Sequence, residues 1–221
     1  METKVKSALV AGINSYAGTE GLDAQPVLAA LEAVFGKEIP FMDKVEEMDA
    51  IFDDQPHFEE LREVCFDLLM INFFAADVQK LEEDYLESEE WENIEEETLD
   101  RGTELLNVFL YLRECEDADV APSLDDYLKE FLLVEEDEFQ DEYRIYEQVI
   151  ANQILVESDY SEIAKVSQSI GENDELYELF YPMIAFFYEP KPTADQIKEY
   201  KNHTSNKALE TALYELMVHF N

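Results

Sequence analysis

The sequence has little positive charge. Its 221 residues include 15 Lys and Arg against 54 Asp and Glu, which gives a formal net charge of −39 at pH 7. Proteins that bind nucleic acid use Lys and Arg to displace phosphate counterions, and anionic membrane surfaces attract basic segments. The composition therefore argues against direct nucleic-acid binding and against binding to a membrane. It predicts a basic protein as the partner.

Glycine, proline and cysteine are scarce too. The chain has 6 Gly, 7 Pro and 2 Cys, whereas 47% of its residues are hydrophobic and 12% are aromatic. Such a chain buries enough apolar surface to fold in spite of its charge, and it has too little cysteine for a disulfide framework. Cys65 and Cys115 lie in or beside apolar helical runs, so we expect both thiols to be buried and reduced.

Long apolar runs are absent as well. Residues 66–76 form the longest run beyond the first helix, but Asp67 and Asn72 interrupt it and it is too short to span a bilayer. Near the start, Lys4 and Lys6 precede only six apolar residues, fewer than the about 7–15 of a signal-peptide core. We therefore expect a cytoplasmic protein.

Helical periodicity is the main structural signal that is present. One helix is expected from Pro26 to Gly36, others begin after Pro40 and Pro56, and Ser205 is the expected N-cap of a last helix. The apolar residues that recur at helical spacing are Val5, Leu9, Ile13 and Tyr16; Val27, Leu28, Leu31, Val34 and Phe35; Phe41, Val45, Met48 and Phe52; Phe58, Leu61, Cys65, Leu68 and Phe74; and Leu209, Leu213, Leu216 and Phe220. No alternating strand pattern competes with them, which predicts an all-α fold.

Charge is distributed unevenly along the chain. Residues 45–180 hold 43 acidic and 7 basic residues, whereas the two ends, 1–44 and 181–221, hold the other 11 acids and 8 bases. We predict a single all-helical domain over 1–221, with an acidic middle at about 45–180 and near-neutral helical ends.

A repeat marks this acidic middle. Ala-Asp-Val at 76–78 and Asp-Tyr-Leu at 84–86 recur 42 positions later, at 118–120 and 126–128, and a weaker copy begins at 159–160. An acidic segment and then a more apolar helix follow each tyrosine. The apolar positions are Leu105, Leu106, Phe109 and Leu112; Val149, Ile150 and Ile154; and Phe180, Ile184 and Phe187. This order favours stacked helical hairpins, as in an α-solenoid, and an irregular multi-helix bundle is the alternative.

Two acidic runs form the candidate partner-binding surface, and we expect each to be an outer helix. The residues are Glu89, Glu90, Trp91, Glu92, Glu95, Glu96 and Glu97 in the first run, and Glu135, Glu136, Asp137, Glu138, Asp141 and Glu142 in the second. Trp91 and Ile94 lie three apart on one helical side. Phe139, Tyr143 and Tyr146 recur at helical spacing, so these three aromatic residues are expected to pack in the core. Each run is either a solvated helix face or a row of carboxylates that docks a basic surface.

An enzymatic alternative rests on Glu59, Glu60 and Glu63. Carboxylates at this spacing share a helix face and can hold one hard cation, as in all-α Mg²⁺-dependent nucleotide pyrophosphohydrolases. The second acidic element of such enzymes has no well-spaced counterpart here, and the histidines, His57 and His203 among them, are scattered. We therefore predict no metal site and no cofactor.

The favoured function is a non-catalytic one. The charge and the foldable core predict a binding or inhibitor-type protein that docks a basic protein partner, as immunity proteins and nucleic-acid mimics do. The alternatives are the Mg²⁺-dependent enzyme and a structural helical scaffold whose charge provides solubility. No sequence feature sets the oligomeric state.

Overall fold

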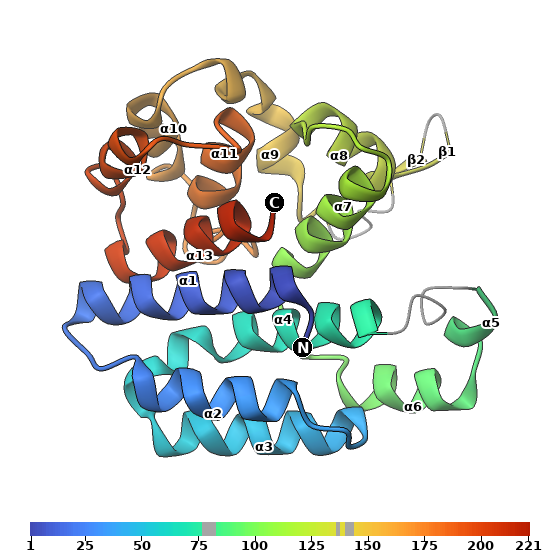
Figure 1. The fold of residues 1–221 in the computed structure, drawn as a ribbon. Coiled ribbons are helices and arrows are strands. Elements are labelled where there is room, and N and C mark those ends of the chain that lie inside the picture. The colour runs from blue at the N-terminus through green and yellow to red at the C-terminus, as the bar shows by residue number, and fades with distance from the viewer. Residues whose placement is uncertain (77–82, 136–137, 140–143) are drawn as a thin grey trace.

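The computed structural model describes residues 1–76, 83–135, 138–139 and 144–221. Helices make up most of this part of the chain (Figure 1), which confirms the all-α prediction. The α-helices are α1 (Thr3–Glu20), α2 (Gln25–Phe35), α3 (Phe41–Asp54), α4 (Arg62–Ala76), α5 (Glu83–Leu86), α6 (Glu89–Glu97), α7 (Leu105–Asp117), α8 (Leu124–Leu132), α9 (Glu147–Ala151), α10 (Tyr160–Ser167), α11 (Phe180–Tyr188), α12 (Ala194–Lys201) and α13 (Lys207–Phe220). The described residues also form two 3₁₀ helices, η1 (Pro56–Leu61) and η3 (Gln153–Glu157), and two short strands, β1 (Leu133–Glu135) and β2 (Glu138–Phe139).

The first and last helices form the centre of the molecule. Figure 1 shows α1 and α13 side by side, with α2, α3 and α4 on one side of the pair and α7 to α12 on the other. Gly12 on α1 allows the close approach, because a Cβ built on it would lie 2.6 Å from Cγ of Leu216 on α13. One connected cluster of buried hydrophobic residues includes residues of both helices and of the elements on either side.

Local sequence explains where these helices begin and end. The Glu2 carboxylate caps α1 by accepting a 2.8 Å hydrogen bond from the Val5 N–H, and Gly21 ends the helix in a left-handed conformation with φ of 71°. Thr193 and Gln196 form a capping box at the start of α12. The apolar residues expected on the faces of α1, α2, α3, α4 and α13 are all buried, as are the reduced thiols of Cys65 and Cys115.

Some local predictions are wrong. The N-cap of α13 is Asn206 and not Ser205, because the Ser205 N–H donates to the Glu210 carboxylate while Asn206 Oδ1 accepts from the Leu209 N–H. Ile154 is 68% exposed, because its segment is a 3₁₀ helix whose three-residue period turns Leu155 inward instead.

The prediction of an outer helix at 135–143 is also wrong for the residues that the structure describes, because Glu135 and Glu138–Phe139 belong to two strands. Leu133 pairs with Phe139, and Glu135 pairs with Glu138, in an antiparallel hairpin. A helix would have placed Glu135 and Glu138 at the i, i+3 spacing that brings like charges together, and β-branched Val134 favours a strand. Residues 136–137 and 140–143 lie outside the described residues.

The repeat does not produce identical structural units. Tyr85 lies in α5, Tyr127 in α8 and Tyr160 in α10, but α6 follows the first of these tyrosines and the β-hairpin follows the second. Only the last two tyrosines are fully buried. The described chain is therefore an irregular multi-helix arrangement. No helix in this part of the chain is both long and apolar enough to cross a membrane.

Candidate protein-binding surface

Helix α6 carries the first acidic run on a small apolar base. Ser88 caps the helix, its Oγ accepting a 3.1 Å hydrogen bond from the Trp91 N–H. Ile94 is buried, and half-buried Trp91 packs against Phe74 of α4 with ring centroids 5.3 Å apart. Trp91, a residue expected at the partner-binding surface, thus joins Ile94 in attaching one side of α6 to the core, and the opposite side is left to solvent.

The rest of the α6 surface presents carboxylates that form no ion pair within the described residues. The exposed acids of α6 are Glu89, Glu90, Glu92, Glu95, Glu96 and Glu97, and within the described residues none of them forms an ion pair. Acids in the first turn suit the positive end of the helix dipole, but the three in the last turn oppose its negative end, where no basic residue is present. Like charges at i and i+3 or i+4 add further repulsion. The last-turn glutamates therefore do not stabilise the helix that carries them.

The loop at 98–104 fixes the end of α6 against α3 and α4. Arg101 donates from Nη1 and Nη2 to the two carboxylate oxygens of Asp49 on α3, each at 3.0 Å, and from Nε to Glu63 on α4, also at 3.0 Å. Its guanidinium lies over the Phe66 ring, 4.9 Å from the centroid. Bidentate pairing and ring stacking both require the planar guanidinium, so this residue positions the loop in a way that Lys could not.

A buried acid on α4 also binds the 98–104 loop through hydrogen bonds. Asp67 of α4 is fully buried and accepts hydrogen bonds from the Thr103 N–H at 3.0 Å and from the Thr103 hydroxyl at 2.6 Å. Burial raises the pKa of Asp67 well above its ordinary value, although the hydrogen bonds from Thr103 favour the charged form. Gly102 has a φ of 84°, and a Cβ there would lie 2.6 Å from Asp67 Oδ1, so only glycine fits between the loop and this carboxylate.

The result is a groove of about 540 Å³ between α3, the end of α6 and Arg101. We call it the acidic groove. Its apolar lining is Met42, Val45 and Ala50, and its charged lining is Asp43, Glu46, Asp49, Asp53, Glu97 and Arg101. Five carboxylates therefore surround a single cation.

The nearby cations are already paired. Arg101 is held by Asp49 and Glu63, and Arg62 donates to Asp53 at 2.6 Å and to Glu59 at 2.8 Å. Asp43, Glu46 and Glu97 form no ion pair within the described residues. The acidic groove consequently keeps a net negative charge that a basic group from another molecule can neutralise.

The described part of the second acidic run lies apart from this groove. In Figure 1 the β1–β2 hairpin extends beside α8, whereas α6 lies at the level of α2 and α3. Glu135 and Glu138 are in the hairpin, and Glu136, Asp137, Asp141 and Glu142 lie outside the described residues. Of the aromatic residues beside this run, Tyr146 is buried as expected, and its hydroxyl donates to the Glu104 carboxylate at 2.6 Å.

The carboxylates of the enzymatic alternative do not converge. Glu59 pairs with Arg62, Glu60 accepts a 2.7 Å hydrogen bond from the Tyr16 hydroxyl, and Glu63 accepts from Arg101. Three acids that share a helix face in the sequence are thus bound to three different partners. In the described part of the chain no group of three or more His, Cys, Asp or Glu side chains is placed to hold a metal ion. His57 is exposed.

Sequence reasoning missed the α3 wall of the groove. Asp43, Glu46, Asp49 and Asp53 recur at helical spacing on the polar face of an amphipathic helix, and that pattern is typical of any surface helix. The ion pair from Arg101 to Asp49 joins residues 52 positions apart, so no local sequence pattern predicts it.

No protein-family model, curated protein or solved structure matches this chain. The acidic groove and the exposed face of α6 are chemically similar surfaces. Both offer hydrogen-bond acceptors and negative charge beside a limited apolar lining. That combination is complementary to Arg and Lys side chains.

Proposed function

We propose that this chain is a non-catalytic binding protein that docks a basic protein partner through the acidic groove and the exposed face of α6. The observation that carries the proposal is the set of last-turn glutamates on α6, Glu95, Glu96 and Glu97, which have no ion-pair partner within the described residues and oppose the dipole of their own helix. Carboxylates that destabilise their own helix are best explained by a charge that arrives from outside.

The partner's chemistry follows from what lines the groove. A guanidinium or ammonium group satisfies the free carboxylates of Asp43, Glu46 and Glu97, while Met42 and Val45 contact the aliphatic part of such a side chain. Leu99, directly after α6, is 78% exposed and offers an apolar contact beside the acids. A surface of this kind fits a basic groove that otherwise holds nucleic acid, such as that of a nuclease or of a DNA-binding protein.

The first test uses an oligoarginine peptide as a defined probe of the surface. We expect the chain to bind it at low salt, and we expect the affinity to fall steeply as salt shortens the Debye length from about 10 Å at 0.1 M towards about 3 Å at 1 M. Neutralising the α6 face should weaken binding more than neutralising an equal number of exposed acids elsewhere. The matched variants are Glu92→Gln, Glu96→Gln and Glu97→Gln against Glu157→Gln, Glu172→Gln and Glu199→Gln.

The comparison between the two triple variants separates the proposal from its alternatives. Equal weakening in both would mean that the peptide senses only net charge, as expected of a scaffold whose charge serves solubility. The same pair of variants then serves as bait for proteins of the native host at low and high salt. A basic protein that is captured at low salt by the wild type and by the control, but not by the α6 variant, is the expected result.

A further inference from the structure

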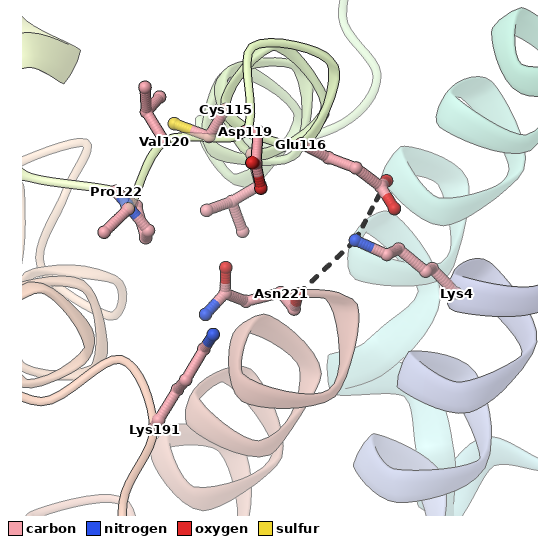
Figure 2. A pocket seen from close by; sticks show the side chains of 10 residues that line it. Lys4, Cys115, Glu116, Asp119, Val120, Pro122, Lys191 and Asn221 are labelled. Carbon is pink, nitrogen blue, oxygen red and sulfur yellow. Dashed lines mark hydrogen bonds and ion pairs between the residues drawn. The ribbon is translucent and has the colours of Figure 1, made fainter.

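A second pocket lies on the other side of the molecule's centre, away from the acidic groove. It has a volume of about 320 Å³, and Figure 2 shows it between the end of α7 with the segment that follows it and the end of α13 with the 190–191 segment. Its apolar lining is Leu112, Val120, Ala121 and Pro122, and its polar lining is Lys4, Cys115, Glu116, Asp119, Lys191 and Asn221. A volume of this order is at the small end of known ligand sites, so a metabolite-sized molecule fits it.

Two exposed charges on opposite walls of this pocket form no ion pair within the described residues. Lys4 is occupied, since its ammonium pairs with Glu116 at 2.9 Å and donates to the Asn221 carbonyl at 3.3 Å. The Lys191 ammonium and the Asp119 carboxylate, in contrast, form no ion pair in the part of the chain that the structure describes. Asp119 approaches from the α7 wall and Lys191 from the α13 wall (Figure 2).

The backbone at Asp119 is unusual for a residue with a side chain. Its φ is 54°, in the left-handed region, directly after α7, where the Val120 N–H bonds to the Cys115 carbonyl at 2.9 Å. Glycine is the residue that most often fills this position after a helix. The fold therefore holds a carboxylate at the edge of the pocket where a residue without a side chain would be less strained.

We propose that this pocket binds a free α-amino acid with a small aliphatic side chain. Lys191 receives the ligand's α-carboxylate, Asp119 receives its α-ammonium group, and Val120 and Pro122 contact the side chain. Asn221 Nδ2 donates to the Pro190 carbonyl at 3.4 Å, so Oδ1 of this side chain supplies a further hydrogen-bond acceptor. This site is independent of the proposed docking surface.

The charge of the whole protein favours a zwitterion over an anion. With a net charge of −39, the chain repels anions on approach. A simple amine lacks a group for Lys191, and a simple carboxylate lacks a group for Asp119. An α-amino acid has no net charge and satisfies both walls at once.

The experiment is a titration of the 221-residue chain followed by NMR chemical shifts of the backbone amides. The probes are L-valine, isobutylamine and isovalerate, which share one side chain but carry both charges, only the ammonium and only the carboxylate. We expect L-valine to shift the amides of Asp119, Val120, Ala121 and Lys191, and each single-charge analogue to bind at least about tenfold more weakly. Equal binding of valine and either analogue, or no shift with millimolar valine, would overturn the proposal.

Variants test the two charges separately. Asp119→Asn keeps a side chain that tolerates the left-handed backbone, and Lys191→Met keeps the aliphatic stem, so both remove charge with little change in shape. Each should lower the affinity for L-valine by about tenfold or more, whereas Lys198→Met, which removes an exposed lysine of α12, should leave it unchanged.

A further variant separates binding from folding. Asp119→Gly relieves the backbone strain, so the thermal midpoint should be equal to that of the wild type or higher, while valine affinity is lost. Retained affinity in both Asp119→Gly and Asp119→Asn would show that the carboxylate has no part in binding and would contradict the proposal.

Discussion

Helices α6 and α13 use glutamate in opposite ways. On α13, the Glu210 carboxylate accepts hydrogen bonds from the Ser205 and Asn206 N–H groups at 2.9 and 3.2 Å, and Glu215 pairs with Lys201 at 3.0 Å. On α6, no glutamate forms an ion pair within the described residues. The two glutamates of α13 are thus buried beside donors and stabilise the fold, whereas those of α6 are exposed to solvent. Net charge alone therefore does not show whether a carboxylate stabilises the fold, whereas the hydrogen-bond or ion-pair partner of that carboxylate does.

The largest expected effect concerns Asp67, a buried acid with donors of its own. Asp67→Ala leaves the Thr103 N–H without its acceptor and opens a small cavity beneath the 98–104 loop. We expect the free energy of unfolding to fall by about 2–3 kcal/mol, measured by urea denaturation. The same change at Glu95 of α6 should lie within about 0.5 kcal/mol of the wild type. Similar losses at the two sites would break the comparison.

The contribution of Asp67 to the unfolding free energy is also expected to depend on pH. Because burial raises its pKa, the folded chain keeps a proton on Asp67 at pH values where the unfolded side chain, with a pKa of about 3.9, has lost it. The folded state then binds more protons, so the contribution of Asp67 is greatest below about pH 4 and is lost as pH rises through the folded pKa. Asp67→Asn has no such proton. The unfolding free energy of the wild type minus that of Asp67→Asn should therefore decline with rising pH, and parallel pH profiles would contradict this assignment.

The next effect concerns Glu210 on α13. Glu210→Ala removes the acceptor of two backbone N–H groups at the start of the helix, and we expect it to lower the unfolding free energy by about 1–2 kcal/mol. Glu199→Ala on α12 is the control, since this exposed acid accepts no such side-chain hydrogen bond among the described residues. A loss at Glu199 as large as that at Glu210 would show that overall charge, and not the hydrogen bonds, sets the stability of this region.

Sequence reasoning predicted the helices better than the site. Periodicity placed Leu209 and Leu216 in the core correctly, because helix amphipathicity is local information. It identified α6 as an exposed acidic helix for the same reason. It did not find Asp49 or Arg101, because their pairing depends on how the loop after α6 folds back on α3. The 42-residue repeat was misleading, since one copy continues into α6 and the next into a hairpin.

The smallest effect tests the acidic helix itself. Glu96→Lys places a cation in the last turn of α6, where it complements the helix dipole and relieves repulsion from Glu92 one turn earlier. We expect the unfolding free energy to rise by about 0.3–1 kcal/mol while affinity for oligoarginine falls. Opposite signs in stability and binding are what a surface built for a partner requires, because its charges are unfavourable until the partner neutralises them. If Glu96→Lys instead lowers stability by more than about 1 kcal/mol, then Glu96 serves the fold as Glu210 does, and the difference between α6 and α13 disappears.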